Sequence, residues 1–136
     1  MVVNDKKIEI RDRVYVKEKA TADIIKRYCE ISGDYNPIHC DEEYANKTKF
    51  GRCIAHGLFC LGLISKAIGM KLPGAGTIFI NERLEYKRPV YVDDTVVAMV
   101  EITNIIEAKF LVEVFVECRN QKNVIVLDGT SLLKII

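Results

Sequence analysis

A segment that is apolar on nearly every helical face constrains the fold of this chain more than any other feature. Hydrophobic residues recur at almost every position between residues 57 and 68, and the pattern predicts a helix that begins near His56. A helix that is apolar all round is enclosed by protein, because exposing any side of it to water is unfavourable. The rest of the chain must therefore supply a layer that wraps around this helix.

Strand-forming runs in the second half of the chain can provide that layer. Residues 77–86, 95–106, 110–118 and 124–134 are rich in strand-forming residues, and short polar segments connect them, as between antiparallel neighbours. A further strand is expected over residues 8–16. We therefore predict an α+β fold in which a long central helix is wrapped by a curved antiparallel sheet of about five strands.

The length of the chain fits one domain. Its 136 residues are enough for one sizeable core, and no shift in composition divides them, so we expect a single domain over residues 1–136. A sheet of about five strands leaves open edges, which natural proteins usually cover. We therefore expect a homodimer or a higher homo-oligomer.

Charge and hydropathy exclude several classes of partner. Acidic and basic side chains balance to a formal net charge of +1 without a basic block, so nucleic acid is not an expected partner. The longest apolar segment, residues 54–70, is interrupted by polar residues and is too short to cross a bilayer. The N-terminal residues 1–16 lack the unbroken apolar core of a signal peptide. These features predict a cytoplasmic protein that does not enter a membrane.

An acid, an amide and an imidazole lie together in a turn-prone loop. Asp34, Asn36 and His39 follow a predicted helix that Gly33 ends. Pro37 fixes its own φ and restricts the residue before it, so the loop should be a stiff bend. Catalytic groups need such stiffness to stay in position.

Asp34 and His39 suit general acid and base chemistry. Their side chains can converge across the bend and hold a water molecule between them. Imidazole titrates near neutral pH and a carboxylate can orient it or share the proton transfer, a contribution of roughly 10² to 10⁴ in rate. A structural alternative explains the same residues, because Asp34 could cap a turn and His39 could cap the next helix.

The dipeptide His56-Gly57 stands where the enclosed helix should begin. A free backbone N–H at a helix N-terminus attracts developing negative charge, so Gly57 can form an oxyanion site. Apolar side chains that follow, such as Phe59, could line a tunnel for an acyl chain. The alternatives are that Gly57 lets the helix approach a strand closely and that His56 is a packed core histidine.

Four residues could in principle form a metal site. His39 and Cys40 with Cys53 and His56 have a spacing that superficially resembles a zinc site. Adjacent residues in regular structure cannot easily point to one tetrahedral centre, and the second pair lies in an apolar context. We therefore expect no metal. No phosphate-binding glycine loop or dinucleotide fingerprint is present, and the five cysteines are expected to be buried, reduced thiols.

The segment 28–41 closely resembles the signature of the MaoC-like (R)-specific enoyl-CoA hydratases, the hydratase 2 motif. The likeness continues over residues 50–57, 72–74, 84–90 and 93–94. The resemblance implies a hot-dog fold. It also implies reversible addition of water to a trans-2-enoyl-CoA, which gives an (R)-3-hydroxyacyl-CoA without a metal or redox cofactor.

The same resemblance implies roles for individual residues. Asp34 and His39 match the catalytic acid and histidine that hold the water, remove its proton and return a proton to the α-carbon. Asn36 matches a loop asparagine that orients the site, and the N–H of Gly57 matches the donor that receives the thioester oxygen. His56 and Ser65 resemble further positions near the substrate.

Three functions follow as hypotheses. The first is an (R)-specific enoyl-CoA hydratase for short to medium acyl chains. The second is a dehydratase for a 3-hydroxyacyl group on acyl carrier protein or on a specialised CoA ester, which would use the same residues. The third, from another class, is a non-catalytic acyl-CoA binding module, because a fold alone does not fix function.

Overall fold

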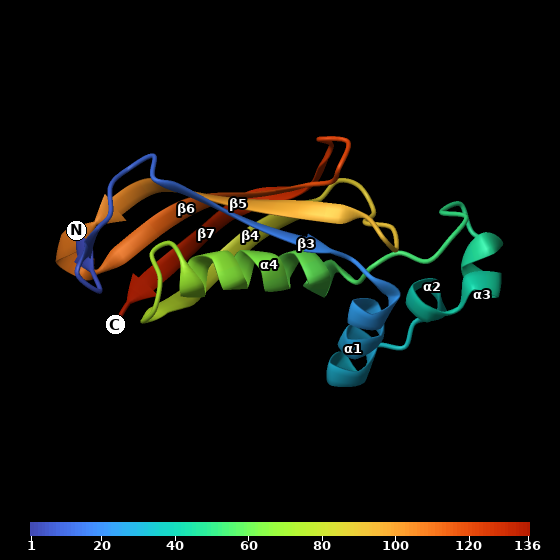
Figure 1. Ribbon diagram of the computed structural model, residues 1–136. Helices are drawn as coiled ribbons and strands as arrows, with labels where there is room; N and C mark the ends of the chain where they lie inside the picture. Colours follow the sequence, from blue (N-terminus) through green and yellow to red (C-terminus); the bar gives the residue numbers. More distant parts are fainter.

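A long helix packed against one face of an antiparallel sheet forms the body of the molecule. The computed structural model describes residues 1–136. Helix α4, Gly57–Met70, runs along a five-stranded sheet with the strand order β3-β5-β6-β7-β4 (Figure 1). The predicted α+β fold and its central helix are confirmed. The strands are β3 Arg13–Lys19, β4 Thr77–Tyr86, β5 Thr95–Ile106, β6 Leu111–Arg119 and β7 Ile125–Ile135.

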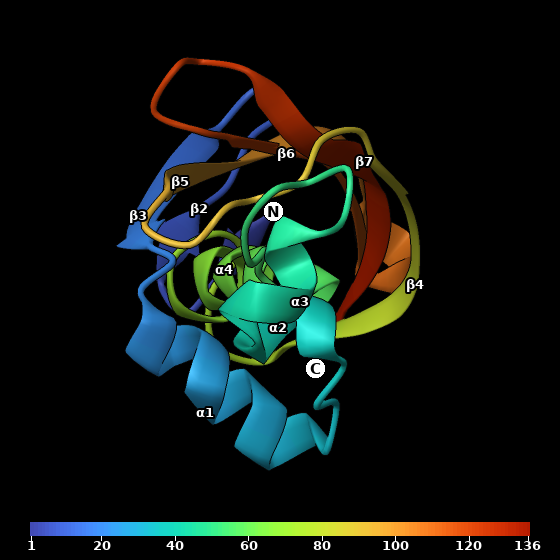
Figure 2. The ribbon, with the colours of Figure 1, turned by 90° about the vertical axis from the view of Figure 1, so that its right-hand side faces the viewer.

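Three short helices cluster at the end of the molecule where α4 begins. They are α1 Ala22–Ser32, α2 Pro37–Cys40 and α3 Glu42–Asn46 (Figures 1 and 2). The segment with the acid and the imidazole therefore lies at the head of the central helix. None of the helices has the length and apolar character needed to cross a bilayer. The remaining elements are the hairpin strands β1 Val2–Val3 and β2 Lys6–Lys7 and the 3-10 helix η1 Glu107–Lys109.

The capping residues of α1 determine where the chain enters the candidate site. At the N-terminus, Thr21 Oγ1 accepts a hydrogen bond of 3.2 Å from the N–H of Ile24. At the C-terminus, Gly33 has a φ of 73°, a left-handed conformation that costs glycine little, and its N–H donates to the carbonyl of Cys29. The chain therefore leaves α1 at a fixed point, directly before Asp34.

The first strand differs from the prediction. A strand was expected over residues 8–16, but the sheet strand begins only at Arg13. A turn precedes it, because Asp12 Oδ2 accepts a hydrogen bond of 2.9 Å from the N–H of Glu9 and Arg11 has a positive φ of 78°. Ile8 is fully buried, so its hydrophobic character reflects core packing before the strand.

The strand expected over residues 110–118 is present as β6, and its side chains alternate between the core and the opposite face. Val112, Val114, Val116 and Cys118 are fully buried, while the residues between them are only partly buried. These side chains belong to the same core as the buried side of α4. Four cysteines are buried as expected, but Cys40 on α2 is exposed, which contradicts the expectation for that residue.

One side of α4 is not covered by the chain itself. Leu58 is 41% exposed and Met70 is 78% exposed, and Ser65 between them is also exposed. The predicted wrapping of the central helix by a curved sheet is confirmed, because the strands from β3 to β4 curve around α4 (Figure 2), but they leave this side of the helix open within a single chain. The edge strand β4 also exposes Ile78 and Ile80, at 46% and 51%.

Two glycine substitutions should have opposite effects on stability. A Cβ at Gly129 would overlap the carbonyl oxygen of Arg83 and lie 2.9 Å from the Cα of Leu84, both backbone atoms of β4. Gly129→Ala should therefore lower the free energy of unfolding by about 1–3 kcal/mol. The control Gly69→Ala meets no atom within 4 Å and should raise it by about 0.5–1 kcal/mol, because alanine favours the helix. Urea titration measures both, and equal stability of the two variants would contradict this packing.

Candidate active site

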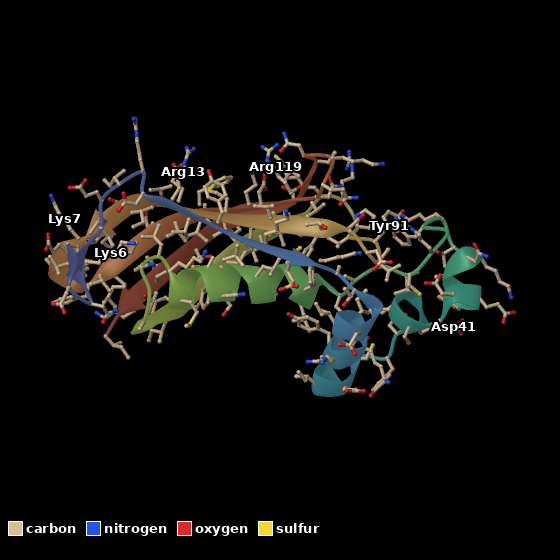
Figure 3. All side chains as sticks on the ribbon, viewed as in Figure 1. Lys6, Lys7, Arg13, Asp41, Tyr91 and Arg119 are labelled. Atoms are coloured by element: carbon tan, nitrogen blue, oxygen red, sulfur yellow. The ribbon has the colours of Figure 1, made fainter.

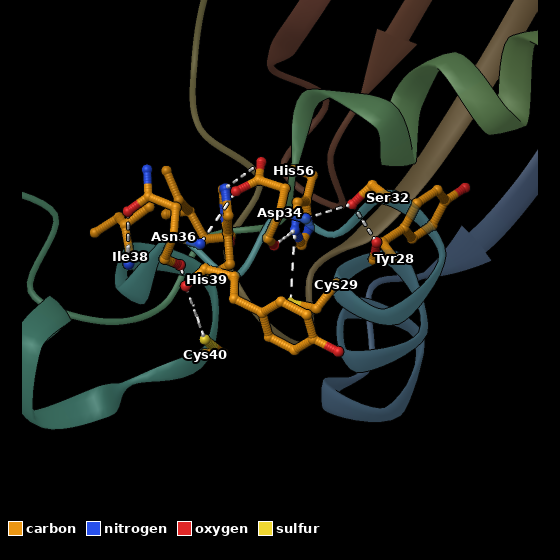
Figure 4. A network of polar contacts seen from close by, with 11 residues as sticks. Tyr28, Cys29, Ser32, Asp34, Asn36, Ile38, His39, Cys40 and His56 are labelled. Atoms are coloured by element: carbon orange, nitrogen blue, oxygen red, sulfur yellow. Dashed lines mark hydrogen bonds and ion pairs between the residues drawn. The ribbon is translucent and has the colours of Figure 1, made fainter.

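The carboxylate of Asp34 is held by the loop through one of its two oxygens. The N–H of Asp34 donates to Ser32 Oγ at 3.1 Å, and the N–H of Asn36 donates to Asp34 Oδ1 at 3.1 Å (Figure 4). Oδ1 therefore caps a turn, as the structural alternative predicted. Oδ2 makes no hydrogen bond within the loop and the side chain is 49% exposed, so this oxygen remains available for chemistry.

A one-turn helix carries the imidazole of His39. Asn36 caps α2, since its side chain accepts a hydrogen bond of 3.3 Å from the N–H of Ile38, and Pro37 occupies the first helical position. The expected loop is thus partly helical. The next helix, α3, is capped by Asp41 and not by His39, so the structural alternative for His39 is wrong.

The orientation of His39 fixes which ring nitrogen faces the acid. Nδ1 lies 2.7 Å from the carbonyl oxygen of Ile54, and because a carbonyl can only accept, Nδ1 carries a proton and donates it. In the neutral ring Nε2 then has a free lone pair, and it lies 3.8 Å from Asp34 Oδ2. This separation is too long for a direct hydrogen bond, but a water molecule can lie within hydrogen-bonding distance of both atoms.

His56 contacts both Asp34 and His39. Its Nε2–H donates to the backbone carbonyl of Asp34 at 3.0 Å, and its ring stacks on that of His39 with centroids 3.8 Å apart. The side chain is buried, and Nδ1 has no hydrogen-bond partner. Cys29 Sγ lies 3.6 Å from Nε2, and burial raises the pKa of this thiol, so it stays protonated at neutral pH. His56 is therefore a buried histidine that contacts both the loop and the ring of His39.

Gly57 opens α4 with a free backbone donor. No hydrogen-bond partner is found within the chain for the N–H of Gly57, as is usual for the first residue of a helix. The ring of Tyr86 packs on this glycine, because a Cβ at residue 57 would lie only 2.7–2.9 Å from the ring and its hydroxyl. Partial burial raises the pKa of the Tyr86 phenol, so the hydroxyl remains neutral at neutral pH.

One cleft brings these groups together. It has a volume of about 490 Å³, and His39, His56, Gly57 and Tyr86 line it. Asp34 is not in the lining of this cleft, but its Oδ2 lies 3.8 Å from Nε2 of His39, which is. The structure does not bring the other two candidates there: Ser65 is exposed farther along α4, and Phe59 is 2% exposed within the core.

The four residues of the possible zinc site do not converge on one point. Cys40 Sγ lies 3.8 Å from the carbonyl oxygens of Tyr35 and Asn36, away from the imidazoles. The ligand atoms that do gather belong to Asp34, His39 and His56, within 4.8 Å of one another. A metal ion bound by imidazole lies about 2 Å from nitrogen, near the ring plane. Two rings stacked with an interplanar angle of 24° cannot meet this condition at one ion, so the residues suit proton transfer better.

Sequence reasoning missed two contributors to the site. The carbonyl of Ile54 sets the tautomer of His39, but a backbone group leaves no trace in residue type. Tyr86 lies at the end of β4, far from the loop in sequence, and its place over Gly57 depends on the packing of β4 and α4. A tyrosine at the end of an amphipathic strand is not by itself a functional signal.

The fold and the site define a class of protein, a hot-dog domain in which an imidazole with an acid beside it lines a cleft at the head of the central helix. Residues 4–124 match the family described as MaoC like domain, and the chain belongs to this family. It is 39% identical over 119 residues to a 3-hydroxybutyryl-CoA dehydratase of Methylorubrum extorquens, a match that covers 88% of this chain and 74% of that protein.

Two further relatives extend the comparison. The chain is 31% identical over 110 residues to a mitochondrial 3-hydroxyacyl-[acyl-carrier-protein] dehydratase of Arabidopsis thaliana, which covers 79% of this chain and 65% of that protein. The solved structure of an (R)-hydratase from A. caviae involved in PHA biosynthesis superimposes with a TM-score of 0.92 at 30% identity, covering 96% of this chain and 99% of that one. The predicted family, the hot-dog fold and the enzyme class, a hydro-lyase, are confirmed.

Proposed function

We propose that the protein is an (R)-specific enoyl-CoA hydratase that adds water reversibly to short and medium trans-2-enoyl-CoA esters. The observation that carries this proposal is that an acid–imidazole pair and a free backbone N–H meet at one cleft. Its lining includes His39, whose Nε2 lies 3.8 Å from Asp34 Oδ2, and Gly57 at the head of α4. Mixing the protein with crotonyl-CoA should cause a rapid loss of the enoyl absorbance, and unchanged absorbance would refute the proposal.

In the proposed reaction the acid–imidazole pair and the N–H of Gly57 act at opposite ends of the conjugated system. A water held by Asp34 Oδ2 and His39 Nε2 gives up a proton to this pair while its oxygen bonds to the β-carbon. The electrons of the double bond move to the thioester oxygen, where the N–H of Gly57 stabilises the developing charge, typically by about 3–4 kcal/mol for such a donor. The pair then returns the proton to the α-carbon as the carbonyl reforms.

The remaining candidate residues have supporting roles in this proposal. Asn36 holds Asp34 through its backbone N–H and caps the helix of His39, so it orients both. His56 fixes their relative position. Ser65 is proposed to meet the distal part of an acyl chain that extends along α4, while Phe59 supports the site from the core, where its ring packs edge-on against Tyr28.

The runner-up function is dehydration of a 3-hydroxyacyl group on acyl carrier protein. Relatives named for dehydration of a CoA ester and of a carrier-protein ester both resemble this chain, and the chemistry is the reverse of hydration. Kinetics on the same acyl group attached to each carrier would distinguish them. A binding module without catalysis is less well supported, because it has no use for a water-activating pair.

The uncovered side of α4 and the edge of β4 support a homodimer. Both expose large apolar residues, and an open apolar strand edge favours pairing with a second chain. We predict a mass of twice the 15.5 kDa of the chain, or a higher multiple, by light scattering. A monomer mass at micromolar concentration would contradict this prediction. The cytoplasmic location also remains a prediction.

A further inference from the structure

A second hollow continues the active-site cleft on its outer side. The cleft and the hollow share Arg88 and Pro89 in their walls, and the hollow has a volume of about 330 Å³. It lies at the end of the molecule where α4 begins, near Tyr91 (Figure 3). The basic side chains around it are Arg52, Arg88 and Lys122, and we call this hollow the basic groove.

The cations of the basic groove have no acidic partner. Arg52, Arg88 and Lys122 are exposed and form no ion pair, whereas the neighbouring Lys87 pairs with Asp128 at 3.3 Å. Arg88 donates only to the carbonyl of Lys87. Three like charges around one hollow repel one another, so they favour an anion between them.

The single carboxylate in the wall of the groove is already satisfied. Asp94 is only 5% exposed, and its two oxygens accept hydrogen bonds from Gln121 Nε2 at 2.7 Å and from the N–H of Tyr91 at 2.9 Å. The bond from Gln121 ties the β6–β7 loop to the segment before β5, and the bond from Tyr91 lies within that segment. Asp94 therefore shapes the groove and does not neutralise the basic side chains at its surface.

The groove is also fixed in shape. The guanidinium of Arg52 lies over the ring of Tyr91, 4.5 Å from its centroid, which holds the long side chain in one place. Tyr91 is itself bridged to Ile54, the residue whose carbonyl orients His39. The groove and the catalytic ring thus rest on the same backbone.

We propose that the basic groove binds the phosphate groups at the nucleotide end of coenzyme A while the thioester occupies the cleft. This inference rests on the proposed function and selects CoA over a carrier protein. A hollow of about 330 Å³ with two arginines and a lysine in its wall suits a small ligand with several phosphates, which guanidinium groups bind bidentately. A large acidic partner protein would also meet Asp41, Glu42 and Glu43, which are exposed at the start of α3.

The test compares three carriers of the same crotonyl group, namely CoA, CoA without its 3′-phosphate, and pantetheine. The double variant Arg52→Gln/Lys122→Gln, which leaves the cleft residue Arg88 in place, should lose about tenfold in kcat/KM on crotonyl-CoA, since each exposed ion pair contributes a factor of about five at most. Its loss on the dephosphorylated ester should be smaller, and its kcat/KM on crotonyl-pantetheine should match the wild type. The matched control is Lys6→Gln/Arg11→Gln, which removes two exposed cations from the N-terminal segment and should change none of the three values.

Other outcomes separate this inference from the proposed function. Wild-type turnover of crotonyl-CoA with equal losses on all three carriers, or with no loss, would overturn the groove and leave the hydratase intact. With crotonyl-acyl carrier protein as a fourth substrate, a loss confined to that substrate would also overturn it. If no thioester turned over, calorimetry with adenosine 3′,5′-bisphosphate would still decide, because binding to the wild type and not to the double variant supports the groove, and absent or equal binding refutes it.

Discussion

Asp34→Asn is expected to lower kcat for crotonyl-CoA hydration by roughly 10² to 10⁴, the usual contribution of a positioned acid or base. Asparagine can still accept the hydrogen bond that Asp34 Oδ1 receives from the N–H of Asn36, so the loop should keep its conformation. What is lost is the charge and basicity of Oδ2, the oxygen that faces His39. Steady-state kinetics with crotonyl-CoA measures the effect.

A matched acidic substitution separates chemistry from charge. Glu30→Gln removes one exposed acid from α1, a few residues before the site, and should leave kcat unchanged. The thermal unfolding midpoint of Asp34→Asn should also stay close to that of the wild type. Full activity in Asp34→Asn would mean that this carboxylate only caps the turn.

His39→Asn should lower kcat by a similar factor. It is a more specific test than His39→Gln. The side-chain amide of asparagine can reproduce the donor to the Ile54 carbonyl while removing the nitrogen that faces Asp34. His39→Gln does the opposite, because its longer amide reaches toward the Nε2 position and gives up the Ile54 contact. Neither amide can accept a proton at neutral pH, so both should lose roughly 10² to 10⁴ in kcat.

The double variant tests whether the two side chains act as one unit. If they share one water, Asp34→Asn/His39→Asn should be about as slow as the slower single variant, since groups that work together give non-additive losses. Multiplied losses would show that the acid and the imidazole act in separate steps.

Much of the fold was predictable because its signals are local. The apolar character of α4 and the strand-forming runs of the second half are patterns that describe one element each, and the helix and the strands that they predicted are present. The first strand was misplaced because Ile8 is buried without being in a strand, and hydrophobicity alone does not distinguish these cases. The uncovered side of α4 could not be predicted, because an apolar helix pattern does not show whether the residues that cover the helix belong to the same chain or to a second one.

The candidate site was predictable in part for a related reason. Asp34, Asn36 and His39 lie within one short segment, so their proximity follows from sequence order and the bend at Pro37. The stacking of His56 on His39 and the donor bond to Ile54 join segments that only the tertiary fold brings together. The basic groove arises in the same way, because Arg52, Arg88 and Lys122 come from three separate segments.

The most direct test of the central claim is the product formed from crotonyl-CoA in deuterium oxide, analysed at early times by mass spectrometry and chiral chromatography. If Asp34 and His39 activate one water and return a proton to the α-carbon, the product is (R)-3-hydroxybutyryl-CoA with a single deuterium on that carbon. The (S) product, or tight binding of crotonyl-CoA without any conversion, would contradict the account.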